Sequence, residues 1–188
     1  MHFFLHGWGS SRASEKNKKF FQSLCTYGDK ILLFPFGEDE EVQQLESYTQ
    51  RFVQNVPDKK LSLTCASRDI PELIEQIKHN DILFFCGGKP YKYFEVIDQI
   101  QGFRSLVKNK IIAGTSWWAI MRSTAYYSSN AENLREWNKF LPIKMIAHRW
   151  AENKLWRSWE EREKLLDDYG EKLPIYKIPE QEYIEMEV

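Results

Sequence analysis

The sequence predicts one α/β domain of three layers, in which a doubly wound and mostly parallel sheet lies between two layers of helices. Short apolar runs alternate with amphipathic stretches along most of the 188 residues, and this alternation is typical of parallel strands joined by crossover helices. The composition, 43% hydrophobic and 28% charged, is that of an ordinary globular protein. No linker, repeat or low-complexity segment divides the chain, so we expect a single domain over residues 1–188.

The first two thirds of the chain supply the parallel sheet. The apolar runs expected to be strands are residues 2–5, 30–34, 61–65, 81–86 and 110–113. The stretches between them, expected to be helices, are residues 14–26, 40–55, 70–79 and 91–108. In the third helix, Leu73, Ile74 and Ile77 form one apolar face, and Asp69 before Pro71 is a favourable N-cap. Right-handed crossovers then give a doubly wound sheet.

The last third is less regular. Residues 143–147 are expected to form a strand, and residues 152–169 a charged helix on the surface. Residues 174–178 and 182–186 are expected to form a terminal strand or hairpin.

Charge and cysteine usage exclude several classes of partner. The 26 Lys and Arg nearly cancel the 27 Asp and Glu, so no basic surface for nucleic acid or an anionic membrane is expected. No window approaches the ~18 apolar residues of a membrane span, and the first residues lack a signal-peptide pattern, so we expect a cytoplasmic protein. The three cysteines lack CxxC spacing and are expected to be reduced thiols. We expect no metal or cofactor, a small peptide or amide as partner, and leave a homodimer open.

Chemistry is expected where the predicted strands end, because loops and helix N-termini converge at the carboxyl edge of a parallel sheet. Four features follow predicted strands there, and we expect them in one sheet. They are Gly87-Gly88, Gly114-Thr115-Ser116, His148 and Glu180.

The four features contain the parts of a serine hydrolase. Ser116 follows a buried strand and precedes the helix-like WWAIMRS, which is the setting of a nucleophile elbow. An alcohol needs a base to take its proton, and the imidazolium that forms needs a carboxylate, so His148 and Glu180 are candidates. The backbone amides of Gly88 and Trp117 are candidates for the oxyanion hole.

The order nucleophile, histidine, acid differs from that of α/β-hydrolases, and here the chain resembles the dipeptidase E and cyanophycinase family. The resemblance spans nearly the whole chain and rests on the segments ILLFPFGEDEE, LESYTQRF, DIPELIEQIKHNDILFFCGGKP, IIAGTSWWA, LPIKMIAH and IYKIPEQEYI. It implies a flavodoxin-like sheet related to that of class I glutamine amidotransferases.

The resemblance also implies residue roles. Ser116 matches the family's nucleophile, His148 its general base and acid, Glu180 its orienting carboxylate and Gly88 its oxyanion-hole glycine. The family acts on aspartyl peptides or polymers, whose carboxylates need cationic recognition. Lys89, Arg122 and Arg149 lie near the matching motifs and are candidates for that contact.

The sequence departs from the family's pattern at the elbow, where Trp117 and Trp118 replace the Ala and Gly that normally follow the nucleophile. Lys89 replaces an Asn, and Ala147 replaces a Pro. We expect at least one indole, with Trp118 a candidate, to line the pocket above Ser116 and contact substrate. The alternative is that both indoles are buried between helix and sheet.

Two functions follow. The first is a serine hydrolase of the peptidase type that cleaves a small peptide or amide. The second is a catalytically inactive relative that binds a peptide or metabolite in a Trp-lined pocket. Ester hydrolysis or acyl transfer on the same sheet is a further alternative.

Overall fold

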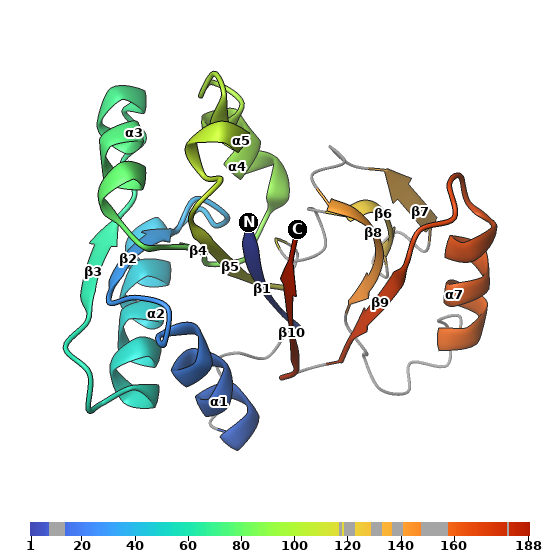
Figure 1. Cartoon of the computed structure of the whole chain (residues 1–188), viewed down its shortest axis with the longest axis horizontal. Coiled ribbons are helices and arrows are strands. Elements are labelled where there is room, and N and C mark those ends of the chain that lie inside the picture. The colour runs from blue at the N-terminus through green and yellow to red at the C-terminus, as the bar shows by residue number, and fades with distance from the viewer. Residues whose placement is uncertain are drawn as a thin grey trace.

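Two β-sheets lie side by side in the computed structural model of the chain (Figure 1). The structure describes residues 1–7, 14–116, 118, 123–128, 133–136, 141–147, 158–179 and 181–188. The first sheet comes mainly from the first two thirds of the chain, and the second sheet lies beyond strand β10 in the view of Figure 1.

The first sheet is six-stranded, in the order β10-β1-β5-β4-β2-β3. Its strands are β1 (His2–His6), β2 (Lys30–Phe34), β3 (Ser62–Cys65), β4 (Ile82–Phe85), β5 (Ile111–Thr115) and β10 (Tyr183–Glu187). All neighbouring strands are parallel except β10, which pairs antiparallel with β1. The predicted mostly parallel sheet is therefore confirmed. The segment expected over residues 182–186 forms its terminal strand, but the alternative of a hairpin with residues 174–178 is wrong, because that segment belongs to another sheet.

Helices cover both faces of this sheet. They are α1 (Glu15–Leu24), α2 (Glu41–Asn55), α3 (Ile70–His79), α4 (Pro90–Ile97) and α5 (Phe103–Leu106). The apolar sides of α1 and α2 belong to one buried cluster, and those of α3, α4 and α5 belong to another on the opposite face. This is the three-layer, doubly wound α/β arrangement that the alternating pattern predicts.

Local residues explain where two of these helices begin or end. Asp69 accepts a hydrogen bond at Oδ1 from the backbone N–H of Glu72 (3.0 Å), so it caps α3 as predicted. The single helix predicted over residues 91–108 is wrong, because α4 ends at Ile97 and α5 begins at Phe103. Gly102 between them has a φ of 73°, a left-handed conformation that interrupts a right-handed helix.

The second sheet is four-stranded, in the order β7-β6-β8-β9. Its strands are β6 (Ser123–Ser128), β7 (Asn133–Glu136), β8 (Leu141–Ala147) and β9 (Ile175–Ile178), and α7 (Trp159–Asp168) packs against them. The expectation that all motif-bearing strands share one sheet is wrong, since β8 and β9 belong here. Strands β6 and β7 were not predicted. Ser123 begins β6 rather than ending a helix, and the following Thr and Tyr residues favour an extended chain.

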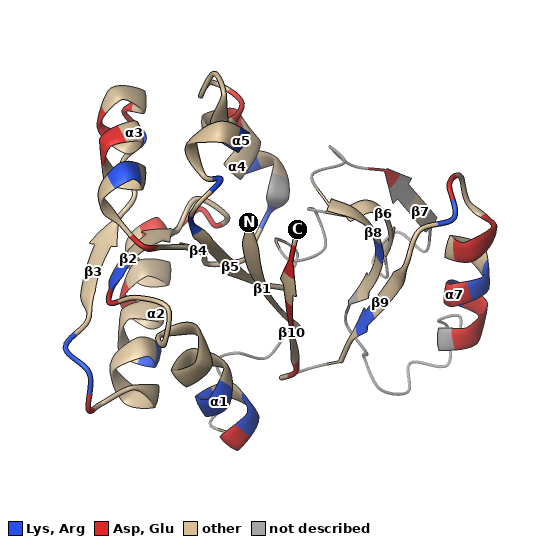
Figure 2. Cartoon of the chain, viewed as in Figure 1, with Lys and Arg blue, Asp and Glu red and all other residues tan. Residues whose placement is uncertain are grey.

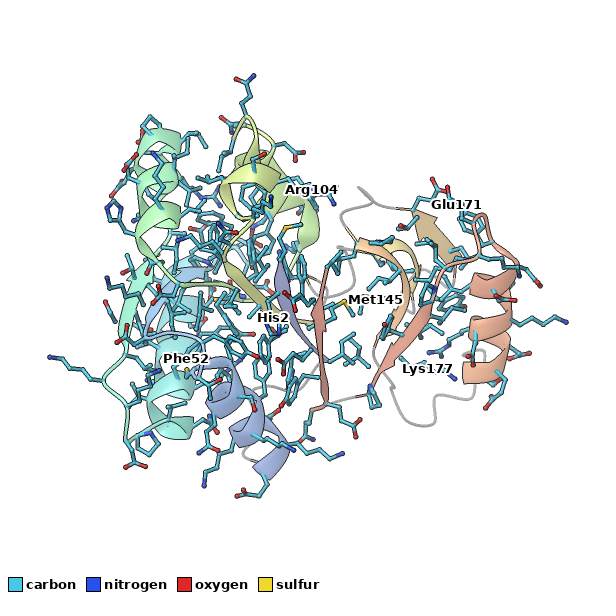
Figure 3. All side chains as sticks on the ribbon, in the orientation of Figure 1. His2, Phe52, Arg104, Met145, Glu171 and Lys177 are labelled. Atoms are coloured by element: carbon cyan, nitrogen blue, oxygen red, sulfur yellow. The ribbon has the colours of Figure 1, made fainter. Side chains whose placement is uncertain are left out.

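One buried hydrophobic cluster joins the two sheets. Met145 of β8, labelled between the sheets in Figure 3, is fully buried and belongs to the same cluster as Phe3 and Leu5 of β1. Strands β4 and β5 carry no charged residue, and charge gathers on helices and connections (Figure 2). Within the ranges that the structure describes, no helix has the length and apolarity needed to cross a membrane.

Candidate active site

Ser116 stands on a strained turn directly after β5. Its φ is 61°, a left-handed value that a residue with a side chain rarely adopts. Its backbone N–H donates a hydrogen bond to the carbonyl oxygen of His6 at the end of the neighbouring strand β1 (3.0 Å). A strained serine at the end of a parallel strand is the geometry of a nucleophile elbow. The structure therefore supplies the turn expected at Ser116.

Gly87 and Gly88 form a second turn, after β4, and this turn lies against the Ser116 turn. Their φ values are 81° and 90°, which only glycine adopts without strain. A Cβ added to Gly87 would lie 3.1 Å from Thr115 Oγ1 and 3.6 Å from Ser116 Cβ. The structure thus brings the candidate oxyanion-hole segment into contact with the candidate nucleophile, as the sequence motifs predict.

A third turn supports the second one. A Cβ at Gly88 would lie 2.5 Å from the carbonyl oxygen of Gly37, in the turn after β2, and one at Gly37 would lie 1.8 Å from that of Gly87. The N–H of Lys89 donates to the Gly37 carbonyl oxygen (2.6 Å). Only residues without a Cβ permit this approach of two backbones, so the position of Gly88 depends on Gly37 as well as on its own conformation.

Two buried tyrosines hold the nucleophile and glycine turns. The hydroxyl of Tyr48, on α2, hydrogen-bonds Thr115 Oγ1 (2.7 Å). The hydroxyl of Tyr93, on α4, donates to the carbonyl oxygen of Gly87 (2.6 Å). Burial raises the pKa of Tyr93 well above its ordinary value, so this phenol stays protonated and remains a donor. Neither tyrosine has a role assigned from the sequence, although Tyr48 lies in LESYTQRF, one of the segments that carry the resemblance.

Trp118 belongs to the hydrophobic core. Its indole is fully buried and stacks on Phe85 of β4, with ring centroids 4.0 Å apart and an interplanar angle of 13°. It also lies over Gly114, where an added Cβ would stand 2.1 Å from the Trp118 Cε3 atom. The expectation that Trp118 contacts substrate does not fit this position, because the ring has no exposed surface. The ring fits there because Gly114 has no side chain.

Trp117, the other indole at the elbow, lies outside the described residues, as do His148, Glu180, Arg122 and Arg149. Their predicted roles stay predictions, including the hydrogen bond between Ser116 and His148. The strands that precede two of them are described. Ala147, the last residue of β8, pairs with Ile178, the last residue of β9, in a parallel ladder.

The segment on either side of residue 180 packs against the end of β1. A Cβ at Gly7 would lie 2.2 Å from the carbonyl oxygen of Pro179. The N–H of Gly7 also donates to the carbonyl oxygen of Glu182 (2.8 Å). Gly7 directly follows His6, whose carbonyl oxygen accepts from Ser116, so this segment and the elbow meet the same strand end.

His6 is a buried neighbour of the elbow. Its ring hydrogen-bonds through Nδ1 to the Gly7 carbonyl oxygen (2.5 Å) and through Nε2 to the side-chain amide of Asn17 (2.9 Å). Burial lowers its pKa from 6.5 to about 4. With both ring nitrogens engaged and its basicity reduced, His6 is poorly suited to act as the base for Ser116.

Lys89, the candidate for carboxylate recognition, already has an anionic partner. Its Nζ lies 2.9 Å from Asp39 Oδ2, and Lys92 contacts the other oxygen of the same carboxylate. The hydrogen bonds from Lys92 and Lys89 lower the pKa of Asp39 to about 2. Recognition of a substrate carboxylate by Lys89 would therefore have to compete with Asp39.

The fold is similar to that of two solved structures. One, a peptidase from an acI-B1 Actinobacterium, is 20% identical over 98% of this chain and 82% of that chain, with a TM-score of 0.64. The other, a putative peptidase E protein from Listeria monocytogenes EGD-e, is 14% identical over 100% of this chain and 98% of that chain, with a TM-score of 0.59. At these identities the likeness establishes the fold, and it is the fold that the resemblance to the dipeptidase E family predicted. No protein-family model and no curated protein matches the sequence.

Proposed function

We propose that the chain is a serine hydrolase of the peptidase type, acting on a small peptide or amide. Ser116 Oγ attacks the carbonyl carbon of the substrate, and His148 takes the hydroxyl proton and later gives it to the leaving amine. Glu180 orients the imidazole and stabilises the imidazolium. The backbone amides of Gly88 and Trp117 donate to the oxyanion of the tetrahedral intermediate. The mechanism uses no cofactor.

The observation that carries the proposal is the left-handed conformation of Ser116 at the end of β5. Strain of this kind costs about 1–3 kcal/mol and persists where the surrounding structure enforces it. A serine that only capped a helix would have extended backbone dihedrals and no such strain. The turn of Gly87, which precedes the proposed oxyanion-hole residue Gly88, lies against the Ser116 turn, and this agrees with the proposal.

The proposed base and acid receive indirect support from their described neighbours. Ala147 and Ile178, which precede His148 and Glu180 by one and two residues, are register partners at the ends of β8 and β9. Pro179 and Glu182 flank Glu180 and contact Gly7, next to the strand end that binds the Ser116 backbone. The names of the two structures with this fold, a peptidase and a putative peptidase E protein, agree with the proposed reaction at the level of the fold.

The catalytically inactive alternative loses part of its basis. It uses the two indoles as stacking surfaces, and the Trp118 ring is buried in the core. Aspartyl specificity is not part of the proposal either, because Lys89 is paired with Asp39.

The test is labelling with a fluorescent fluorophosphonate, in which Ser116 Oγ bonds to phosphorus and fluoride leaves. We expect labelling of the wild type and none of Ser116→Ala. His148→Ala should remove nearly all labelling, because it disables the same step, whereas Glu180→Gln should cost less. A wild-type protein that stays unlabelled, while hydrolysing no peptide in a dipeptide panel, would support the inactive alternative and overturn the proposal.

A further inference from the structure

A buried hydrogen bond between two hydroxyl groups anchors the turn that contains Ser116. Thr115, the residue before Ser116, is 1% exposed, and Tyr48 is 6% exposed. The side chain of Thr115 points to the face of the sheet that α2 covers, where its Oγ1 lies 2.7 Å from the Tyr48 hydroxyl. Removing either hydroxyl breaks this buried hydrogen bond, which favours a shift of the turn.

The turn of Gly87 and Gly88 is held in the same way from the opposite face. Tyr93 is fully buried in the cluster formed with α3, α4 and α5. Its hydroxyl donates to the Gly87 carbonyl oxygen at 2.6 Å, with the carbonyl oxygen of Phe34 at 3.2 Å as a second acceptor. Each helical layer therefore contributes one tyrosine to the carboxyl edge of the sheet.

The two anchored turns touch each other. Thr115 Oγ1 lies 3.1 Å and the Thr115 carbonyl oxygen 3.2 Å from the position of a Cβ on Gly87. A continuous line of contacts thus runs across the sheet from Tyr48 through Thr115 and Gly87 to Tyr93. The distance between Ser116 and the N–H groups of the glycine turn depends on both ends of this line.

We propose that Tyr48 and Tyr93 are positioning residues that set the nucleophile turn against the oxyanion turn. The inference rests on the proposed hydrolase function and assigns no contact with substrate to either phenol. Catalysis by such a site requires attacking oxygen and oxyanion donors in fixed relative positions, and a displacement of about 1 Å can cost about 100-fold in rate. A left-handed serine is strained, so its conformation depends on contacts of this kind.

The experiment compares the fluorophosphonate labelling rate constant of Ser116 among Tyr→Phe variants. Tyr48→Phe and Tyr93→Phe each keep the ring and lose one hydroxyl. The matched control is Tyr183→Phe, which loses a hydroxyl bonded to the Ser23 hydroxyl (3.1 Å) on the same side of the sheet as Tyr48. We expect a rate constant reduced about tenfold in each of the first two variants and unchanged in the control.

Two further readouts separate positioning from loss of fold. Irreversibly misfolded protein lowers the final extent of labelling, whereas a displaced turn lowers the rate constant of the folded molecules and leaves the extent unchanged. In the double variant Tyr48→Phe/Tyr93→Phe the labelling rate constant should fall by less than the product of the two single reductions, because both hydroxyl groups set the distance between the same two turns. If a Tyr variant fails to fold, Thr115→Ser should label at the wild-type rate and Thr115→Val should label slowly.

The outcomes distinguish the two proposals. Wild-type rate constants in Tyr48→Phe and Tyr93→Phe, with Ser116 labelled normally, would overturn the positioning role and leave the hydrolase standing. A wild-type protein that is neither labelled nor active on the dipeptide panel would remove the hydrolase, and the positioning role with it. An equal reduction of the labelling rate constant in Tyr183→Phe would show that removal of any tyrosine hydroxyl slows labelling, and it would also overturn the positioning role.

Discussion

The indole of Trp118 occupies the space that a side chain at residue 114 would take. A Cβ on Gly114 would approach the Trp118 Cε3 atom to 2.1 Å, well inside van der Waals contact. The bulky residue at the start of the elbow is therefore matched by a missing side chain on the strand beneath it, and Phe85 of β4 completes the stack. This pair explains how the fold accommodates a tryptophan where small residues normally pack.

Trp118→Ala should destabilise the protein by about 3–5 kcal/mol, because it leaves a large cavity in the core. It should not speed hydrolysis of bulky substrates, since the ring is buried. Urea unfolding and hydrolysis rates on the same preparations check both statements. Faster turnover of bulky substrates with little loss of stability would mean that the ring gates the pocket.

Gly114→Ala should destabilise by about 1–3 kcal/mol, because the new methyl group overlaps the indole. In the background of Trp118→Ala the same change should cost much less, since the ring is gone. A double-mutant cycle of unfolding free energies measures this coupling. Additive effects would show that the overlap with the ring is not the source of the cost.

Gly7→Ala should slow labelling of Ser116, because the methyl group would displace Pro179 and the segment around Glu180. The control is Gly170→Ala, where no atom lies within 4 Å of the new Cβ and φ is 59°. That change costs about 1–2 kcal/mol of backbone strain and should leave the labelling rate constant unchanged. Equal labelling rates in the two variants would argue against a role for this segment.

Because His6 is buried, the free energy of unfolding should decrease as the pH falls below neutrality. Its pKa is about 4 in the folded protein and 6.5 when unperturbed, so the unfolded chain binds more protons between these values. Its contribution to stability therefore falls as the pH drops from 6.5 to 4 and is constant below that. Between pH 7 and pH 5 the loss should be about 2 kcal/mol.

Unfolding free energies at pH 7 and pH 5 check this prediction. His6→Gln should lose about 2 kcal/mol less over this interval than the wild type. The stability that the lowered pKa of Asp39 contributes is lost only as the pH falls below the ordinary value of 3.8, which is outside the interval. Identical pH dependence in His6→Gln would contradict the assignment.

Lys144→Met should loosen the end of α7. The buried ammonium of Lys144 donates to the carbonyl oxygens of Leu166 (2.5 Å) and Tyr169 (2.6 Å), which end this helix. Losing these bonds should cost about 1–3 kcal/mol and speed amide hydrogen exchange in α7. The control is Lys164→Met, at an exposed position of α7. Unchanged stability would mean that burying the ammonium costs as much as its hydrogen bonds contribute.

Much of the first sheet could be predicted because its cause is local. Apolar runs and helical spacing depend on neighbouring residues, and β2 and α3 begin and end where these patterns do. The order Gly114-Thr115-Ser116 after an apolar run likewise predicted the elbow, and Gly87-Gly88 predicted the turn that meets it.

Tertiary structure alone decided the features that depend on distant partners. Strand β6 pairs with β7 and with β8, so the formation of a second sheet depends on these distant partners and cannot be predicted from the residues of β6 and β7 alone. Trp118 is buried because Gly114 and Phe85 leave room for it, and Tyr48 reaches Thr115 across 67 positions of the chain. The sequence by itself determined the order along the chain of the strands in the first sheet and the residues that follow their ends. The packing of helices on the sheet determined which of those residues meet, because contacts between distant segments exist only once the chain is folded.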